Sequence, residues 1–508
     1  MTEQYLKPNP KALAKIKHIV VLMMENHSFD NMLGWLYEDE KPTNGQFFEG
    51  LNNELCNPLN IIDDNGLPFI EQVYARKNGQ PPKKGSYGVM HKKHYFEDFC
   101  LPNPDPGEGF KDTNQQLFEY FDVANLYPPT PTNKGFVNNY ANAMLYGTSV
   151  YGDAPSDPRD IMASYTPSQT PVLSKLSKEF AVCDYWFCSV PSQTLPNRDF
   201  VHAATSTGYV NNKPDSDCDA KTIYQQIQDA IDSGRKELSW GIYSGTEYSK
   251  DEHAYVPFSL TRTIMSQLQD SQFDQNFKCI KQFYSDAKAG TLPSYTFLEP
   301  QFSGENQNDQ HPPSDIRAGE QLMADIYDAI VNSPTWQETL FVITYDEHGG
   351  CYDHVEPGKA IAPDGEDSKP GQDGFLFNRM GVRVPTVVIS PLIDKGCIGR
   401  PAGYTPFDHT SLIATAQQCF GLAGSLTARD KAAPDLSCLL TRDNTRKDKP
   451  TVTPLPYKKE QVKQDSENDL QQLAATVLGK ISGVSRADKE HIHDYIHRAY
   501  DHRFDSKK

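Results

Sequence analysis

The sequence lacks any long apolar run. No stretch approaches the roughly 18 uninterrupted apolar residues that a helix needs to cross a bilayer, and residues 1–17 are polar, without the apolar core of a signal peptide. We therefore expect a cytoplasmic protein, a protein that is secreted or periplasmic by a route without a visible signal peptide, or a mature form.

Positive charge is scarce as well. The chain has 67 acidic against 49 basic residues, a formal net charge of −18. Such a surface repels a nucleic-acid backbone, so we expect no nucleic-acid partner. Anionic membranes match the surface as a whole equally poorly, although a cation bound in an acidic cleft would change the balance locally.

The ten cysteines show no CxxC spacing, which argues against a zinc ribbon or a thioredoxin-like site. Cys183 and Cys188 are close in sequence and are compatible with a disulfide or with two free thiols. What the sequence does have is the composition of a folded protein, with 37% hydrophobic and 23% charged residues. A length of 508 residues is ample for one large domain with appendages.

Three short apolar runs predict the core of the fold. Ile19–Met24, Leu340–Tyr345 and Val384–Ile389 have the character of buried parallel strands. Ser314–Ile330 has apolar residues near helical spacing and predicts an amphipathic helix. Strands that alternate with helices predict an α/β fold with a central, mostly parallel sheet between helices, whose chemistry gathers beyond the carboxyl ends of the strands.

Two long segments are rich in turn-forming residues. Asp39–Tyr87 is rich in Asn, Gly and Pro, and Val355–Gly374 is rich in Gly and Pro. Loops of this length inside a compact domain are uncommon and tend to be lids or binding loops. We expect both to be insertions into the α/β domain.

The composition changes near the C-terminal end. Residues 442–465 are charged and poor in apolar side chains, which is typical of a linker, and two capped helices are expected to start at Ser466 and Ser485. We therefore predict a catalytic domain over residues 14–445 and a linker with a helical extension over 446–508. His493 and His497 have the i, i+4 spacing of metal ligands, but with no partner cluster nearby we expect a solvated helix face.

The first candidate for chemistry directly follows the first apolar run. Glu25 and Asn26 would supply two oxygen ligands for a hard or borderline cation at the end of a buried strand. In the alternative interpretation, Asn26 and Ser28 only cap the next helix and Glu25 faces solvent.

The second candidate, residues 345–350 (Tyr-Asp-Glu-His-Gly-Gly), follows another apolar run. Asp346 and Glu347 would point to opposite sides of a regular strand, so the chain must turn if both are to meet one ion, and Gly349 and Gly350 would supply that turn. Two acids brought together here would be costly without a cation. A solvated acidic turn is the alternative, although the preceding strand is too apolar for an ordinary surface loop.

The third candidate is a proline-stiffened segment over residues 189–198. It offers three hydroxyls, on Ser189, Ser192 and Thr194, that a metal could activate to attack phosphorus, and the spacing does not choose between them. Arg198 would hold an anionic oxygen with two hydrogen bonds. Taken alone, the segment favours a proline-rich structural turn with a solvated arginine.

The fourth candidate is His311 in residues 308–315 (Asn-Asp-Gln-His-Pro-Pro-Ser-Asp). The two prolines keep this histidine out of a regular helix. It would donate a hydrogen bond to phosphate or act as the general acid for a leaving group. A histidine alone in a loop is also compatible with a structural role.

Together these segments resemble the bacterial phosphoesterase family that contains phospholipases C and related acid phosphatases. The resemblance lies in four motifs: Glu-Asn-His-Ser-Phe-Asp at 25–30, Thr-x-Pro-Asn-Arg at 194–198, Asn-Asp-x-His-Pro-Pro at 308–313 and Tyr-Asp-Glu-His-Gly-Gly-x-Tyr-Asp-His at 345–354. They occur in the family's order between about Lys17 and about Leu440. The family is similar to a branch of the alkaline phosphatase and sulfatase superfamily, which implies a sheet sandwiched by helices.

The resemblance implies a site as well as a fold. It implies a divalent metal ion, zinc or calcium, held by four side chains and completed by the nucleophile hydroxyl: Glu25, Asn26, Asp346, Glu347 and Thr194. The threonine, where acid phosphatase members tend to have serine, favours the phospholipase C branch. His311 matches the family's phosphate-contacting or acid histidine.

One position departs from the family pattern. Many members have a histidine in an Asp-Pro-x-His segment, whereas this chain reads Asp105-Pro106-Gly107-Glu108. A carboxylate at Glu108 could bind a second cation or an amine of a ligand, but it donates no hydrogen bond to phosphate unless protonated. The proton-transfer roles and the head-group of the substrate are therefore open at this point.

We expect a metal-dependent hydrolase of phosphoric esters, a phospholipase C that acts on phosphocholine-type diesters through Thr194. The partners would be a phospholipid or another small phosphate ester, with peripheral contact to a membrane and an apolar entrance built from Gln46–Leu51 and Tyr95–Phe110. A broad-specificity acid phosphatase is the alternative enzyme. An inactive binding protein with the same fold is the alternative of another class, and a sulfatase-like enzyme ranks last because the chain has no Cys-x-Pro-x-Arg segment.

Overall fold

The computed structural model describes residues 5–62, 65–78, 99–120, 130–146, 157–212, 218–251, 254–304, 306–403, 405–457, 469–488 and 490–504. Its centre is an eight-stranded sheet with the strand order β11-β8-β12-β1-β13-β14-β6-β15. In chain order, these strands are β1 (His18–Met24), β6 (Ala181–Val182), β8 (Trp240–Ser244), β11 (Phe277–Cys279), β12 (Tyr295–Glu299), β13 (Thr339–Tyr345), β14 (Thr386–Ile389) and β15 (Cys397–Ile398).

The strands β1 and β13 form the middle of the sheet, as their apolar sequences predict. They are parallel, with His18 opposite Thr339 and Met24 opposite Tyr345, and β1 is also parallel to β12. Residues 19–24 and all of β13 are buried, because helices cover both faces of the sheet. These two predicted strands are confirmed.

The third predicted strand is confirmed in place but was wrong in direction. The strand β14 runs antiparallel to β13, with Phe341 opposite Ile389. The chain between them returns through a long loop without a crossover helix, so β14 enters the sheet from the opposite end. An apolar run that is buried on both faces has the same sequence pattern in either direction.

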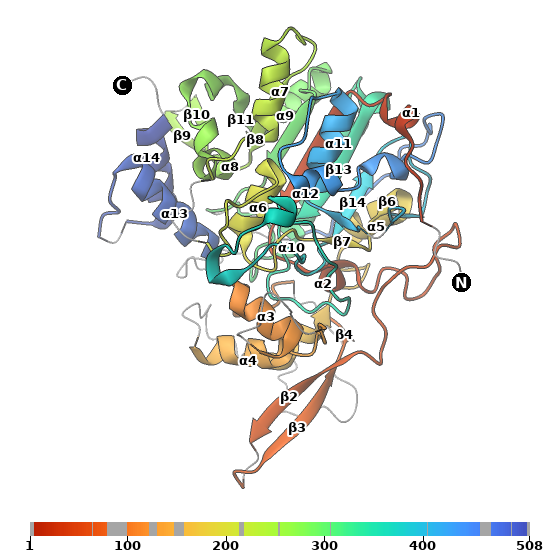
Figure 1. Cartoon of the computed structure of the whole chain (residues 1–508), viewed down its shortest axis with the longest axis vertical. Helices are drawn as coiled ribbons and strands as arrows, with labels where there is room; N and C mark the ends of the chain where they lie inside the picture. Colours follow the sequence, from red (N-terminus) through yellow and green to blue (C-terminus); the bar gives the residue numbers. More distant parts are fainter. Residues whose placement is uncertain are drawn as a thin grey trace.

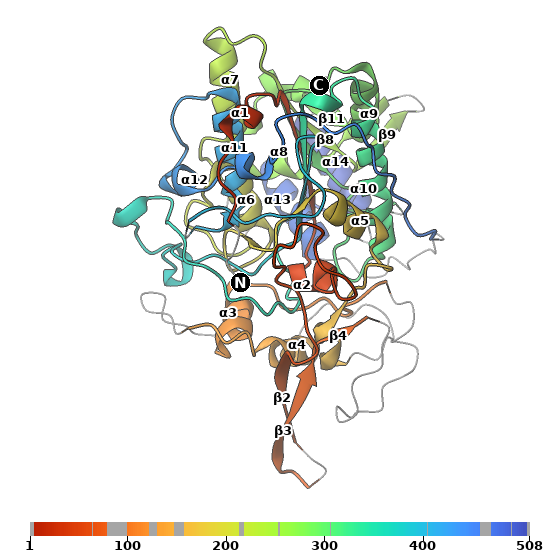
Figure 2. The ribbon, with the colours of Figure 1, turned by 90° about the vertical axis from the view of Figure 1, so that its right-hand side faces the viewer.

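Two layers of helices enclose the sheet, which confirms the predicted α/β sandwich (Figures 1 and 2). One layer contains α5 (Pro171–Glu179), α9 (Ile280–Ala289) and α10 (Ile316–Val331), and the other contains α6 (Thr194–Ala203), α7 (Ile223–Asp232), α11 (Thr410–Phe420) and α12 (Ala428–Ala432). The helix α10 is the amphipathic helix predicted over 314–330. Asp315 caps it by accepting a hydrogen bond from the backbone N–H of Arg317.

Shorter elements complete the described part of the chain. The helices are α1 (Pro10–Leu13), α2 (Phe29–Leu33), α3 (Phe110–Phe118), α4 (Phe136–Tyr146) and α8 (Leu260–Ile264), with 3₁₀ turns at Pro158–Met162, Ser266–Leu268, Ser271–Asn276, Trp336–Glu338, Gly365–Asp367, Gln372–Gly374 and Leu436–Leu439. The two-stranded sheets are β2 (Cys56–Ile62) with β3 (Pro68–Tyr74), β4 (Arg76–Lys77) with β5 (Ala163–Ser164), β7 (Trp186–Phe187) with β16 (Phe407–Asp408), and β9 (Glu247–Asp251) with β10 (Ala254–Pro257).

The segment Asp39–Tyr87 is less irregular than its sequence predicts. It contains the hairpin β2–β3, which projects from the end of the molecule that carries α3 and α4 (Figure 1). A proline in each strand and two asparagines in β2 obscure the strand pattern. Residues 79–87 lie outside the described part of the chain, and Val355–Gly374 is a loop with short 3₁₀ turns, as expected.

Two helices follow the charged segment, α13 (Asp469–Ser482) and α14 (Ile492–Phe504). Ser466 lies outside the described residues, and Ser485 lies seven residues before α14, so its predicted role as a cap was wrong. Leu470, Leu478 and Tyr500 belong to the same apolar core as the central sheet, and the ring centroids of Tyr500 and Phe258 are 5.3 Å apart. The division into domains at 445 stays a prediction.

The expected solvated face of α14 was wrong. His497 is buried, and burial lowers its pKa to about 3. His493 Nδ1 lies 2.8 Å from the hydroxyl of Ser303. The buried stripe of α14 extends to these histidines because His497 lies beside Ile496 and Tyr500, which are buried.

Within the described residues, no helix is long and apolar enough to cross a membrane. The ten cysteines are free thiols, so Cys183 and Cys188 do not pair with each other, although both are buried.

Candidate active site

The first two candidate segments meet at one edge of the sheet. Because β1 and β13 are parallel neighbours that end opposite each other, the residues that follow them emerge side by side. Glu25, Asn26, Asp346 and Glu347 are all fully buried there. The backbone N–H of Asn26 donates to Asp346 Oδ1 at 3.2 Å. The structure thus brings together the four predicted metal ligands.

Two glycines allow this close approach. Gly349 and Gly350 have φ angles of +57° and +64°, in the left-handed region, which confirms the predicted turn. A Cβ on Gly349 would lie 2.2 Å from the carbonyl oxygen of Asn26, and one on Gly350 would lie 2.5 Å from that of Gly107. Only glycine at both positions lets the loop after β13 pass directly against its neighbours.

The four side chains fit a metal ion. Each has one buried oxygen that takes part in no hydrogen bond with the described residues, namely Glu25 Oε2, Asn26 Oδ1, Asp346 Oδ2 and Glu347 Oε1. Such oxygens are costly in a protein interior unless they bind water or a cation. Burial, reinforced by Asp346, raises the pKa of both Glu25 and Glu347 well above its ordinary value. Carboxylate and amide oxygens suit a divalent cation.

Helix α6 brings the nucleophile candidate to the same place. Thr194 is the first residue of the helix, and Arg198 follows one turn later on the same face. The Arg198 guanidinium donates to Glu25 Oε1 and lies 3.4 Å from Asp346 Oδ2. Arg198, predicted to hold an anionic oxygen, thus contacts two carboxylates of the site.

The structure distinguishes the three candidate hydroxyls. Ser189 donates to Asp408 Oδ2 at 3.0 Å, and Ser192 donates to the backbone carbonyl of Val210. Both hydroxyls are therefore engaged in holding the segment in place. Thr194, at the start of α6, has neither of these roles.

A second cluster adjoins the first through Asn26. The amide Nδ2 of Asn26 donates to Glu108 Oε2 at 2.7 Å and lies 3.0 Å from His311 Nε2. Because His311 Nδ1 donates to the carbonyl of Pro312 at 2.8 Å, its Nε2 accepts in this arrangement. Asp105, Glu108 and His311 have ligand atoms within 4.8 Å of one another, so this group could also hold a cation.

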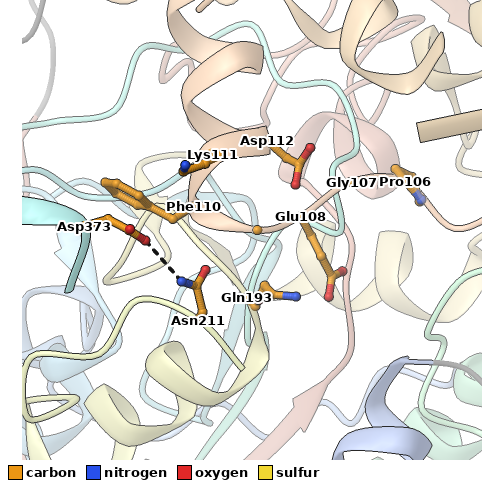
Figure 3. A pocket seen from close by; sticks show the side chains of 10 residues that line it. Pro106, Gly107, Glu108, Phe110, Lys111, Asp112, Gln193, Asn211 and Asp373 are labelled. Carbon is orange, nitrogen blue, oxygen red and sulfur yellow. Dashed lines mark hydrogen bonds between the residues drawn. The ribbon is translucent and has the colours of Figure 1, made fainter. Parts of the chain in front are cut away.

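A pocket of about 380 Å³ opens at Glu108 (Figure 3). It is lined by Pro106, Gly107, Glu108, Gly109, Phe110, Lys111, Asp112, Gln193, Asn211 and Asp373. Gln193 directly precedes Thr194, which places the pocket beside the candidate nucleophile. Asn211 and Asp373, joined by a hydrogen bond of 3.2 Å, come from distant loops and have no signal in the sequence.

The expected apolar entrance was only partly correct. Phe110 lines the pocket, but no residue of Gln46–Leu51 does. That segment packs elsewhere: the Phe48 ring lies 5.8 Å from Phe29, and Leu51 donates to the backbone of Gly34 at 2.8 Å. Residues 95–98 lie outside the described part of the chain.

The sequence pattern of the Phosphoesterase family matches residues 16–423, most of the chain. The chain belongs to this family. Non-specific phospholipase C3 of Arabidopsis thaliana is 34% identical over 468 residues, which cover 89% of this chain and 79% of that protein. Phospholipase C B of Mycobacterium tuberculosis is 26% identical over 457 residues, which cover 85% and 78%. The family resemblance is confirmed, and its relatives include plant proteins as well as bacterial ones.

The solved structures that resemble this chain share less sequence identity with it than these relatives do. A putative sulfatase from Bacteroides thetaiotaomicron has 10% identity and a TM-score of 0.33, over 55% of this chain and 72% of that one. A protein in the alkaline phosphatase superfamily from Vibrio parahaemolyticus has 12% identity and a TM-score of 0.30, over 53% and 65%. The α/β class rests on the sheet described above, and the family makes this protein a phosphoric ester hydrolase.

A buried charge network supports the loop after β13 in this phosphoesterase. Arg383 donates to Asp30 Oδ1 and to Asp353 Oδ1, both at 2.9 Å, and all three side chains are fully buried. His354 Nδ1 lies 2.6 Å from Asp30 Oδ2. Asp30, Asp353 and His354 are close enough to hold a metal, but Arg383 already supplies a positive charge to the two carboxylates.

This network predicts a pH dependence of stability. Burial alone would lower the pKa of His354, but Asp30 and Glu49 raise it to about 10. An unfolded histidine has a pKa of about 6.5, so between about pH 7 and pH 8 only the folded state keeps this proton. The free energy of unfolding is therefore expected to fall with rising pH, by at most about 1.4 kcal/mol per unit. Thermal unfolding would show this slope, and His354→Gln should flatten it; an unchanged slope would refute the assignment.

His409 supports the site in a way that the sequence did not reveal. Its Nε2 donates to the backbone carbonyl of Asp346 at 2.6 Å, and its Nδ1 accepts from Trp186 Nε1 at 3.3 Å. The segment Asp408–Ser411 lies within the residues that match the family, but its sequence does not indicate this role.

Proposed function

We propose that this phosphoesterase is a metal-dependent phospholipase C with Thr194 as its nucleophile. The observation that carries the proposal is a set of four buried oxygens, one on each predicted ligand, that form no hydrogen bond with any described residue and lie at the helix that begins with Thr194. The names of the relatives support a phospholipid diester as substrate.

The chain's own residues supply most of the mechanism. The Thr194 hydroxyl gives its proton to solvent water as its oxygen forms a bond to phosphorus, and the bond from phosphorus to the leaving alcohol breaks. A divalent ion held by Glu25, Asn26, Asp346 and Glu347 would lower the pKa of that hydroxyl and offset charge on the phosphoryl oxygens. The N-terminus of α6, where Thr194 lies, favours the same anionic oxygens.

His311 is the proposed proton donor to the leaving alcohol. In this structure its Nε2 accepts from Asn26, so it must first be protonated and released from that contact. Water then breaks the bond between phosphorus and the threonine oxygen, which frees the phosphorylated head-group and restores the hydroxyl. Arg198 holds Glu25 and Asp346 in place.

The choice of metal follows from the donor set. All four predicted ligand atoms are oxygens, and none belongs to a cysteine or a histidine. Calcium binds oxygen ligands, whereas zinc sites usually include nitrogen or sulfur. Of the two ions proposed, this set favours calcium.

A phosphomonoesterase of the acid phosphatase type is the second candidate. The pocket favours it in one respect, because Phe110 is its only large apolar side chain among charged and polar neighbours. A small polar ester would fit such a lining as well as a lipid head-group does. An inactive binding protein is disfavoured because the ligand set and Thr194 are intact.

The test compares a chromogenic phosphocholine diester with the matching phosphate monoester, with and without a chelator. We expect the diester to be hydrolysed faster, the chelator to abolish activity, and added calcium to restore it. Faster hydrolysis of the monoester would identify the acid phosphatase branch instead. Full activity after exhaustive chelation would refute metal dependence, and no activity on either ester would favour the binding protein.

A further inference from the structure

The hairpin β2–β3 takes no part in the site described above. It projects from the body, and among the described residues it meets the body at its base (Figures 1 and 2). There Leu59 and Val73 join an apolar cluster with residues of α3 and α4, among them Leu117 and Phe136. Beyond this base most described residues of both strands are exposed. Of nine exposed large hydrophobic side chains in the described residues, five belong to this segment: Ile62, Leu67, Phe69, Ile70 and Tyr74.

One face of the hairpin carries no charge. Residues that pair directly across two antiparallel strands lie on the same face. The pairs on this face are Cys56 with Tyr74, Pro58 with Gln72, Asn60 with Ile70, and Ile62 with Pro68. Ile62 is 74% exposed and Ile70 is 63% exposed. We call these eight residues the uncharged face.

The opposite face differs. It carries Leu59 and Val73, which are buried at the base, and Glu71, which lies 3.6 Å from the guanidinium of Arg159. The opposite face therefore packs on the body at the base, although Phe69 near the turn is 47% exposed on that side. Most residues of the uncharged face are exposed. A surface that exposes apolar side chains in this way marks an interaction site.

We propose that the uncharged face docks this protein onto the surface of a zwitterionic lipid bilayer. The inference rests on the proposed phospholipase function. Ile62 and Ile70 would enter the boundary between head-groups and acyl chains, and Tyr74 at the base would lie at the level of the head-groups, where tyrosine is favoured.

The charge of the protein surface indicates which kind of lipid head-group the uncharged face would bind. Binding to anionic lipids relies on lysine and arginine near the membrane surface, and the uncharged face has neither. The net charge of −18 repels an anionic surface further. A bilayer of phosphatidylcholine, whose head-groups carry no net charge, matches this face.

The strands are poorly suited to a second copy of the chain. Pairing through the open edges of a hairpin needs backbone N–H groups, and Pro58 in β2 and Pro68 in β3 remove one from each strand. The uncharged face, rather than an edge, is therefore the part of the hairpin that is open to a partner.

The position of the hairpin suits a lipid substrate. Its base packs on α3 and α4, and the first turn of α3 lines the pocket beside Thr194. A docked hairpin would hold this end of the molecule at the bilayer, where the phosphate diesters of the lipids lie.

The test measures cosedimentation with phosphatidylcholine vesicles. Ile62→Ser/Ile70→Ser is expected to lower the partition coefficient at least tenfold. The matched control is Ile361→Ser, since Ile361 is an isoleucine outside the hairpin that is 45% exposed; it should bind as the wild type does. Hydrolysis of the soluble chromogenic diester should stay unchanged in both variants, which shows that they are folded. Vesicles with equal parts of phosphatidylserine should bind no better than phosphatidylcholine alone.

The other outcomes would overturn the proposal. These are equal binding of the double variant and the wild type, tighter binding to the anionic vesicles, or a hairpin-dependent dimer in sedimentation velocity without vesicle binding. If the double variant fails to fold, Ile62→Ser alone, at the most exposed residue of the uncharged face, tests the same point. Vesicle binding without hydrolysis of any phosphate ester would refute the proposed function and leave the docking surface standing.

Discussion

Replacing Thr194 with alanine is expected to lower kcat on the chromogenic diester by about a thousandfold or more. Removing the nucleophile of a hydrolase leaves only the contributions of binding and electrostatic stabilisation, and measured losses reach about 10⁶. Thr194→Ser keeps a hydroxyl at the start of α6 and should retain a measurable fraction of the rate. Steady-state kinetics at saturating substrate would separate the two variants.

Ser192→Ala is the matched control for this experiment. Ser192 lies two residues before Thr194, is equally buried, and donates its hydroxyl to the carbonyl of Val210. Its loss should change the rate by less than about tenfold, because only a structural hydrogen bond of about 1 kcal/mol is removed. If Thr194→Ala kept a rate within tenfold of the wild type, the nucleophile assignment would be wrong. A large loss in Ser192→Ala alone would point to that hydroxyl instead.

Replacing Arg383 with methionine is expected to destabilise the protein by about 3–5 kcal/mol. The change leaves Asp30 and Asp353 buried without their shared cation, and breaking a buried ion pair from one side has costs of this size. Chemical denaturation would measure the loss as a lower midpoint. The network touches α2 and the loop after β13, so this variant should also lose activity in proportion to its unfolded fraction.

Arg442→Met provides the comparison. Arg442 lies 2.6 Å from Asp394, but the side chains of this pair are 37% and 51% exposed. Such a surface ion pair contributes about 0–1 kcal/mol to the free energy of unfolding, so this variant should be nearly as stable as the wild type. Equal stability of the two variants would show that the Arg383 network does not hold the fold together.

The central strands of the fold could be predicted because their continuous apolar pattern results from burial on both faces of the sheet. The runs that became β1 and β13 are apolar throughout, since both faces of a central parallel strand are covered. The same pattern carries no information on direction, which is why β14 was placed correctly but oriented wrongly. The hairpin was missed because its outward face has the composition of a loop, and α14 was misjudged because burial of His497 depends on a distant surface.

The candidate site also has residues that the sequence predicts and residues that it does not. Glu25 and Asp346 could be recognised in the sequence because each is an acidic residue that directly follows a buried strand. A carboxylate in such a position is costly unless a bound ligand compensates its charge. Gly349 and Gly350 were recognisable as a turn. The pocket residues Asn211 and Asp373 were not, because their place beside Gln193 depends on how separate loops fold over one another.

The pairing of β1 with β13 also determines when, during synthesis and folding, the active site can form. Asn26 and Asp346, which meet at this edge, are 320 residues apart in the chain, so a nascent chain has half of the four proposed ligands until β13 and the residues after it have been synthesised. Contacts between such distant segments form late and slow the folding of a domain. A cation that binds only the complete set would stabilise the finished fold and none of its precursors. The time at which a refolding sample first takes up metal would therefore mark the closure of the central sheet.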